Sequence, residues 1–94
     1  PPDFEARKGM FELMLKDKPC DFGMDYNELS RITENYASSD IKNIIDIIAR
    51  DAAFNNLERI SMDLIMVAIK NNPSRLSQDK IDKYFKTYAT HTSS

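Results

Sequence analysis

The sequence predicts an all-α fold, a compact bundle of four to five helices. Apolar residues recur at intervals of three and four along nearly the whole chain, the spacing that places them on one face of a helix. No segment of useful length alternates between apolar and polar residues, so no strand is predicted. Helix start and stop signals separate the apolar stretches, and this agreement between local signals is typical of a compact helical domain.

The first predicted helix runs from Asp3 to Leu15. Asp3 follows Pro2 and can accept hydrogen bonds from the unpaired N–H groups at the helix start. Gly9 lies inside the helix and costs about 1 kcal/mol relative to alanine, a cost that packing must offset. The expected buried stripe comprises Phe4, Met10, Phe11, Leu13, Met14 and Leu15. Residues 17–23 are expected to form a loop.

The second predicted helix begins at Asp25. The Asp25 side chain can cap this helix while Glu28, three residues later, reaches back to complete a capping box. Its inner face is expected to contain Leu29, Ile32 and Tyr36.

The third predicted helix has the clearest apolar pattern. It begins at Ser38 or Ser39, with Asp40 near the positive end of the helix dipole, and it ends at Asn55-Asn56. Its buried stripe has helical spacing throughout and comprises Ile41, Ile44, Ile45, Ile48, Ala49 and Ala52. A helix with this pattern should lie at the centre of the core.

Two further helices are predicted in the C-terminal part of the chain. Ser61 caps the fourth, and Asn71-Asn72-Pro73 ends it. Ser77 caps the fifth, whose inward-facing residues are expected to be Ile81, Tyr84, Phe85 and Tyr88. The helical domain is thus expected to span residues 1–88, and residues 89–94 to form a disordered polar tail.

Length and composition fit one cytoplasmic domain. The chain has 94 residues, with 13 basic and 15 acidic side chains and a net charge of −2, which is unfavourable for nucleic-acid binding. A helix-turn-helix function is least favoured, because residues 39–52 carry only Lys42 and Arg50 as basic groups. No apolar stretch approaches the roughly 18 residues of a membrane span. The chain begins with Pro1 rather than Met, so we expect it to be part of a longer protein.

The inventory of catalytic groups is small. The two glycines, Gly9 and Gly23, are isolated, so no glycine-rich phosphate loop is present. Cys20 is the single cysteine and has no nearby histidine, which favours a structural thiol over a nucleophile. The single histidine, His91, lies in the predicted tail. We therefore expect no catalytic residue and no metal site in this chain alone.

Four stretches follow one another in a familiar order. The first is Pro1-Pro2-Asp3 with the helix from Arg7 to Leu15, and the second is the acidic and apolar run from Met24 to Tyr36. The third is Tyr36-Ala37-Ser38-Ser39-Asp40-Ile41, and the fourth runs from Pro73-Ser74-Arg75-Leu76-Ser77 through Tyr84. This order resembles the C-terminal helical lid, or small subdomain, of the AAA ATPases, in the subgroup that includes the Vps4-like, katanin and Cdc48 proteins.

The resemblance implies a role beside a nucleotide. In this family the lid covers the nucleotide of a preceding α/β domain, which holds the Walker A and B motifs and the arginine fingers. By position, Met10 and Met14 would face the base and ribose, and Ser38-Ser39 would lie against the adenine. Many relatives have His at the Met14 position and Gly-Ala at Ser38-Ser39, and Ala37 stands where their capping serine is. One possibility is that Ser38 caps the helix and Ser39 touches the nucleotide.

The resemblance also implies the function of the whole protein. In the full-length protein this lid would cover the adenine of bound ATP and couple ATP hydrolysis to conformational change and protein remodelling. Mg²⁺ would be bound by the preceding domain and not by this chain. The implied partners are the large AAA subdomain of the same chain, neighbouring subunits of a ring, expected to be a hexamer, and a protein substrate, with no nucleic acid or membrane. The alternative is a stand-alone helical module that binds a partner helix in a groove.

Overall fold

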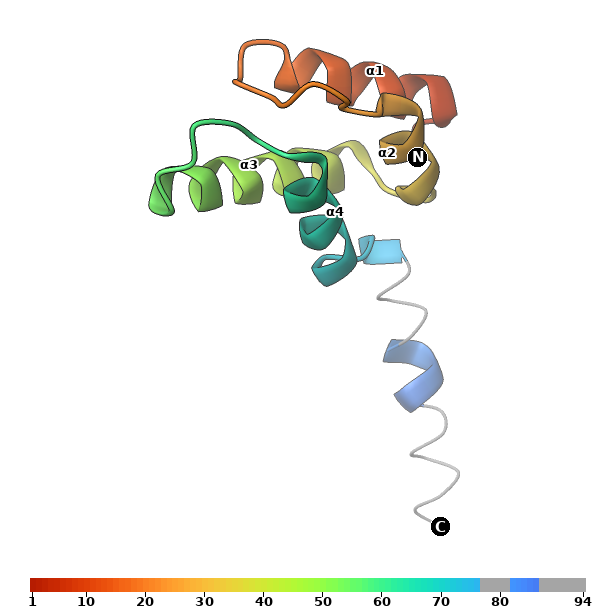
Figure 1. Ribbon diagram of the computed structural model, residues 1–94. Helices are drawn as coiled ribbons and strands as arrows, with labels where there is room; N and C mark the ends of the chain where they lie inside the picture. The colour runs from red at the N-terminus through yellow and green to blue at the C-terminus, as the bar shows by residue number, and fades with distance from the viewer. Residues whose placement is uncertain (77–81, 87–94) are drawn as a thin grey trace.

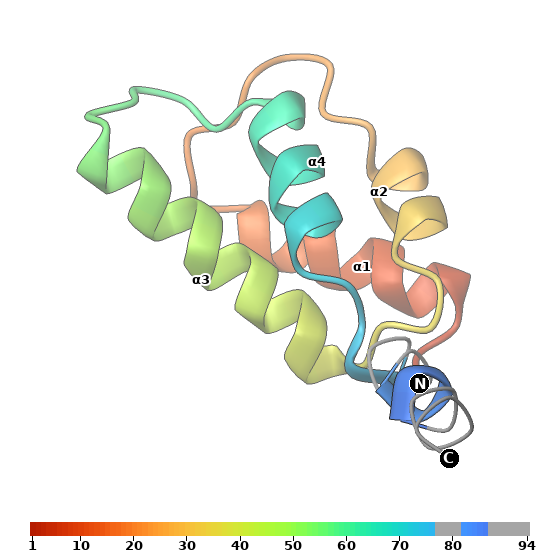
Figure 2. The same cartoon turned by 90° about the horizontal axis from the view of Figure 1, so that it is seen from below.

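The computed structural model describes residues 1–76 and 82–86, and these residues form an all-helical bundle. Its helices are α1 (Phe4–Leu15), α2 (Tyr26–Ile32), α3 (Ser38–Phe54) and α4 (Met62–Asn71). Residues 75–76 and 82–86 are also helical, and the described residues contain no β-strand. The long helix α3 is central, because α1 packs on it from one side and α4 from another, while α2 packs against α1 (Figures 1 and 2). The predicted fold class is confirmed.

Three helices begin at the predicted capping residues. The side chains of Asp3, Asp25 and Ser61 each accept a hydrogen bond from the backbone N–H three residues later, at 2.8, 3.0 and 3.0 Å. Each bond satisfies one of the N–H groups that a helix start leaves without an intrahelical partner. These starts follow from local sequence alone.

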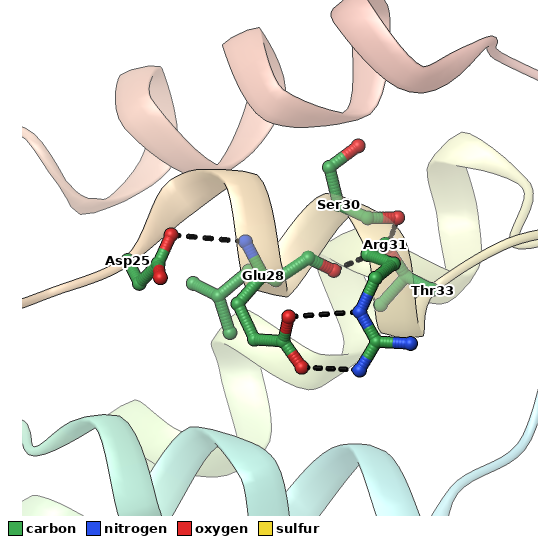
Figure 3. A network of polar contacts seen from close by, with 6 residues as sticks. Asp25, Glu28, Ser30, Arg31 and Thr33 are labelled. Carbon is green, nitrogen blue, oxygen red and sulfur yellow. Dashed lines mark hydrogen bonds and ion pairs between the residues drawn. The ribbon is translucent and has the colours of Figure 1, made fainter.

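The predicted capping box of α2 is wrong. Figure 3 shows Asp25 bound to the backbone N–H of Glu28, while the Glu28 carboxylate lies against the Arg31 guanidinium. Arg31 donates from Nε at 2.8 Å and from a second nitrogen to the other carboxylate oxygen. This hydrogen bonding lowers the pKa of Glu28. The carboxylate therefore pairs with the next turn of its own helix and does not reach back to Asp25.

The core is built mainly from α3 and the helices that pack on it. Its buried apolar residues are Phe11, Leu15, Leu29, Tyr36, Ile41, Ile44, Ile45, Ile48, Ile60, Ile65, Ala68 and Ile69. The four isoleucines predicted for α3 are buried, and Ala49 and Ala52 are half-buried at the edge of the same stripe. The prediction for this helix is confirmed.

The predicted stripe of α1 is partly wrong. Phe11 and Leu15 are buried, but Leu13 is 72% exposed and Phe4 is 38% exposed. Leu13 lies two residues from both buried side chains, about 200° around the helix, and so it faces solvent. The third member of the buried stripe is Arg7, four residues before Phe11.

Backbone hydrogen bonds join the two long connections of the bundle. Asp21 N–H donates to the carbonyl of Ile60 at 2.9 Å, and Ile60 N–H donates to the carbonyl of Pro19 at 2.7 Å. The resulting parallel bridge between Cys20 and Ile60 ties the α1–α2 loop to the segment that leads into α4. Residues 16–25 do form the predicted loop, which turns at Gly23 with a φ of +88°.

The predicted fifth helix is described only in part. Its cap Ser77, Ile81, Tyr88 and the predicted tail at residues 89–94 lie outside the described residues. Tyr84 and Phe85 were expected to face the core, but they are 66% and 62% exposed. Figure 1 shows that residues 82–86 extend away from the bundle, in agreement with the exposure of these two side chains. The two rings contact each other edge to face, with centroids 5.7 Å apart.

No helix among the described residues is both long enough and apolar enough to span a membrane.

Candidate functional site

The two methionines predicted to face a nucleotide lie one turn apart on α1. Met10 and Met14 are both half-buried and pack against the edge of the core. Part of each side chain therefore remains accessible. A thioether is apolar and polarizable, so this part of α1 can make contact with the face of a flat ring and can offer no strong hydrogen bond.

The two serines predicted to lie near the adenine occupy the first turn of α3. Ser38 and Ser39 are both exposed. Ser39 lines a small hollow of about 310 Å³ together with Asp40, Lys42, Asn43, Asp46 and Arg75. Neither methionine lines this hollow. The structure thus places the methionines and the serines on two helices that pack together, and of the four residues only Ser39 lines this hollow.

The Asp40 side chain stabilises the start of α3 by a hydrogen bond to the N-cap residue. The N-cap residue is Ala37, which has an extended backbone and no side chain that could cap the helix. The Asp40 carboxylate accepts a hydrogen bond from the Ala37 N–H at 2.8 Å. Ser38 is already inside the helix, so the idea that Ser38 caps it is wrong. The carboxylate at this helix start also opposes binding of a phosphate there, because it places a negative charge next to the helix N-terminus.

Removing this carboxylate should destabilise the protein. We expect Asp40→Ala to lower the free energy of unfolding by about 1 kcal/mol, since it removes the acceptor for Ala37 N–H and a favourable interaction with the helix dipole. Ser38→Ala is the matched control and should change stability by less than about 0.5 kcal/mol. Urea unfolding followed by circular dichroism measures both. A larger loss for Ser38→Ala than for Asp40→Ala would identify Ser38 as the cap after all.

A large groove in the described part of the chain was missed in the sequence. It has a volume of about 790 Å³ and lies between the end of α2 and one face of α4. Its apolar walls include Ile32, Met66 and Val67, and charged residues that line it include Glu34 and Asp63. The exposure of Met66 and Val67, 38% and 56%, is unusual for an apolar pair on a core helix. In the sequence, this pair of adjacent apolar residues was the signal that could have indicated a groove on α4.

Tyr36 forms part of this groove and links its two walls. Its hydroxyl donates to the carbonyl of Asn72 at 2.6 Å and lies 3.1 Å from the carbonyl of Ile69. Burial raises the pKa of Tyr36 to about 12, with a smaller contribution from the Asp40 carboxylate. The hydroxyl thus remains protonated at neutral pH and holds the C-terminal end of α4 against the loop that follows α2.

The described residues offer no metal-binding cluster. No group of three or more histidine, cysteine, aspartate or glutamate side chains in that part of the chain is arranged to hold an ion. Burial raises the pKa of the Cys20 thiol, which makes it a poorer nucleophile at neutral pH.

Known proteins that resemble this chain were found by sequence. No family model matches the chain. It is 30% identical over 88 residues to the proteasome-activating nucleotidase of Sulfurisphaera tokodaii, which covers 88% of this chain and 22% of the relative. It is 32% identical over 60 residues to the ATP-dependent zinc metalloprotease FTSH 9, chloroplastic/mitochondrial, of Oryza sativa subsp. japonica, which covers 64% of this chain and 8% of the relative. The chain thus spans about a fifth or less of these relatives' length.

A solved structure shares the fold. A katanin structure, described as the structural basis for katanin self-assembly, superposes with a TM-score of 0.63. The match covers 79% of this chain and 32% of the katanin chain, at 18% sequence identity. At that identity the likeness shows the arrangement of helices and nothing finer.

Proposed function

This chain belongs to the AAA ATPase family and has the fold of its C-terminal helical lid, and on that premise we propose that it covers the adenine of ATP bound by a preceding domain. The observation that carries the proposal is the similarity along 88% of the chain to a nucleotidase. The half-buried Met10 and Met14 on α1 and the exposed Ser38 and Ser39 on α3 are consistent with contact to a base and ribose.

The lid supplies only a small part of the affinity for ATP. Apolar contacts to one face of an adenine contribute about 1 to 3 kcal/mol. A dissociation constant of 1 mM already requires roughly 4 kcal/mol. The phosphates and Mg²⁺, which carry most of the affinity and all of the hydrolysis, belong to the domain that would precede Pro1. The chain alone is therefore neither an effective ATP-binding protein nor an ATP hydrolase.

In the full-length protein the lid would transmit the nucleotide state. Closure over the adenine and rigid-body rotation would change how the lid packs against the large AAA subdomain of its own chain and against neighbouring subunits of a ring, a hexamer in this proposal. One relative is named as an ATP-dependent zinc metalloprotease and another as a nucleotidase, and the katanin structure concerns self-assembly. ATP hydrolysis would drive remodelling of a protein substrate, in a cytoplasmic setting.

A titration of the isolated chain with ATP tests the adenine contact. We expect NMR shifts confined to Met10, Met14, Ser38 and Ser39 that are still rising at about 10 mM ATP, because the contact energy is below the roughly 4 kcal/mol that a millimolar dissociation constant requires. Adenosine should produce the same shifts, since no phosphate contact is expected. The methyl group of Met66 lies in the groove between α2 and α4 and serves as an internal control.

Three results would overturn the proposal. Saturation at micromolar ATP would mean that the chain holds the phosphates, and shifts centred on Met66 would place the nucleotide in the other groove. A preceding segment of the same reading frame that lacks a Walker A motif would remove the proposed parent enzyme.

The second candidate function is a stand-alone module that binds a partner helix. The open apolar groove between α2 and α4 favours it, because an exposed apolar channel of this size suits the apolar face of an amphipathic helix. This candidate predicts no contact with nucleotide even when the preceding segment is present. Adenine-dependent shifts at Met10 and Met14 would therefore exclude it.

A further inference from the structure

Arg7 is a buried charged residue near the start of α1. It is only 6% exposed and lies on the same face of α1 as Phe11 and Leu15. Its Nε and one terminal nitrogen donate to the carbonyl of Ser30, at 3.1 and 3.0 Å. Its other terminal nitrogen donates to the carbonyl of Pro2, at 2.9 Å. The guanidinium thus bridges two carbonyls that lie 28 residues apart in the sequence.

The carbonyl of Pro2 belongs to the leading segment, residues 1–3. In the proposed full-length protein this segment follows the nucleotide-binding domain. The carbonyl of Ser30 belongs to α2. A second bond joins α2 to the first residue of α1, because the Ser30 hydroxyl donates to the carbonyl of Phe4 at 2.6 Å. Asp3 is also fixed from within α1, since its side chain caps Ala6 and its carbonyl accepts from the Arg7 N–H at 2.9 Å. The leading segment is therefore held by α1, and the Arg7 guanidinium connects it to α2 through the carbonyl of Ser30.

We propose that Arg7 is a positioning residue that makes the leading segment part of the rigid body of the lid, so that the lid turns about backbone bonds that precede Pro2. The proposal rests on the proposed function, because a turn has meaning only if a nucleotide-binding domain precedes Pro1. A guanidinium suits this task because its planar fork can donate to two acceptors in fixed directions and it stays charged when buried. When Pro2 moves, α1 and α2 then move with it as one body, and the backbone does not bend between Pro2 and Asp3.

NMR of the 94-residue chain tests the clamp without any nucleotide. We expect the {¹H}–¹⁵N NOE of Asp3 and Phe4 to equal that of residues inside α1, although chain ends normally show low values. We also expect the Arg7 Nε–H to exchange with solvent at least about tenfold more slowly than the Nε–H of Arg31, which pairs with Glu28 on the exposed surface. Arg31 is thus an internal reference in the same spectrum.

Variants separate positioning from general stabilisation. Arg7→Lys and Arg7→Gln should each lower the NOE of Asp3 below that of residues inside α1, although the bonds from Ala6 N–H and from the N–H of residue 7 remain, while the methyl shifts of Ile44 and Ile48 stay unchanged. Ser30→Ala keeps the Ser30 carbonyl that Arg7 needs, so the NOE of Asp3 should be retained. Arg31→Gln should have no effect on Asp3. A residue that only stabilised the core would leave the NOE of Asp3 unchanged in every folded variant.

The proposal is overturned if the wild-type Asp3 is already as mobile as a free chain end, or if Arg7→Lys leaves its NOE unchanged. If the Arg7 variants do not fold, the wild-type protein alone tests the proposal. A low NOE at Asp3, or an Arg7 Nε–H that exchanges as fast as the Arg31 Nε–H, would then overturn it. These readouts need no ATP. Failure of the clamp is therefore distinguishable from failure of the adenine contact, which the ATP titration measures at Met10 and Met14.

Discussion

Phe11→Ala is expected to lower the free energy of unfolding by about 3 to 5 kcal/mol. The Phe11 side chain is completely buried between α1 and the rest of the core. Truncation removes its transfer free energy and leaves a cavity that the packed helices can fill only in part. Single domains have a total stability of roughly 5 to 15 kcal/mol, so the variant should be close to unfolding at room temperature. Urea unfolding followed by circular dichroism measures the loss.

Leu13→Ala is the matched control on the same helix. Leu13 is 72% exposed, so its truncation should change stability by less than about 0.5 kcal/mol. The two variants also test which face of α1 packs against the core. Equal losses at the two positions would show that α1 is rotated so that Leu13 faces the core, as the sequence suggested.

Tyr36→Phe is expected to change both the stability of the protein and its dependence on pH. At pH 7 the variant should lose about 1 to 2 kcal/mol, because the carbonyl of Asn72 loses its bond from Tyr36 and the carbonyl of Ile69 is left with the bond from the Asn72 N–H at 3.2 Å. In the wild type the pKa of Tyr36 is about 12 in the folded chain, against an ordinary value of 10.0. The folded state therefore holds this proton when the unfolded state has released it. The stabilisation is complete below pH 10 and is lost as the pH rises towards 12, by about 2 to 3 kcal/mol in total.

The difference between wild type and Tyr36→Phe isolates this effect. Denaturant unfolding at a series of pH values from 7 to about 11 should show that difference shrinking above pH 10. Burial also raises the pKa of Tyr26, so Tyr26→Phe reports how much alkaline destabilisation arises elsewhere. A constant difference between wild type and Tyr36→Phe across this range would contradict the assignment.

Much of the fold could be predicted because its signals are local. The caps of α1, α2 and α4 depend on one side chain and an N–H three residues away. The inner face of α3 depends on spacing along a single helix. Such features are decided within a few residues, and the sequence therefore contains them directly.

The errors concern features that depend on what another element does. Glu28 had two possible partners at similar spacing, and it pairs with Arg31. The apolar pattern around Tyr84 and Phe85 predicts an inner face only if that segment folds back on the bundle, and residues 82–86 do not. Spacing alone cannot supply this information, because it describes one helix and not its neighbours.

The candidate site was predicted from a resemblance and not from spacing. The residues Met10, Met14, Ser38 and Ser39 remain the proposed nucleotide contacts, and the structure adds that α1 and α3 pack together. The bridging role of Arg7 could not be read in advance, because its acceptors are backbone carbonyls, which every residue has. The one sequence signal was a charged residue placed four positions before Phe11, on what is otherwise a buried stripe.

The backbone bridge between the α1–α2 loop and the segment before α4 helps this fold to tolerate changes in amino-acid sequence. Its hydrogen bonds join Asp21, Ile60 and Pro19 entirely through backbone atoms. Side chains such as those of Asp21 and Arg59 can be exchanged without loss of these bonds, and only proline at position 21 or 60 would remove a donor. This end of the bundle can therefore accumulate substitutions while its two loops stay joined, which is one physical route by which relatives with less than a third of their residues in common can keep the same arrangement of helices.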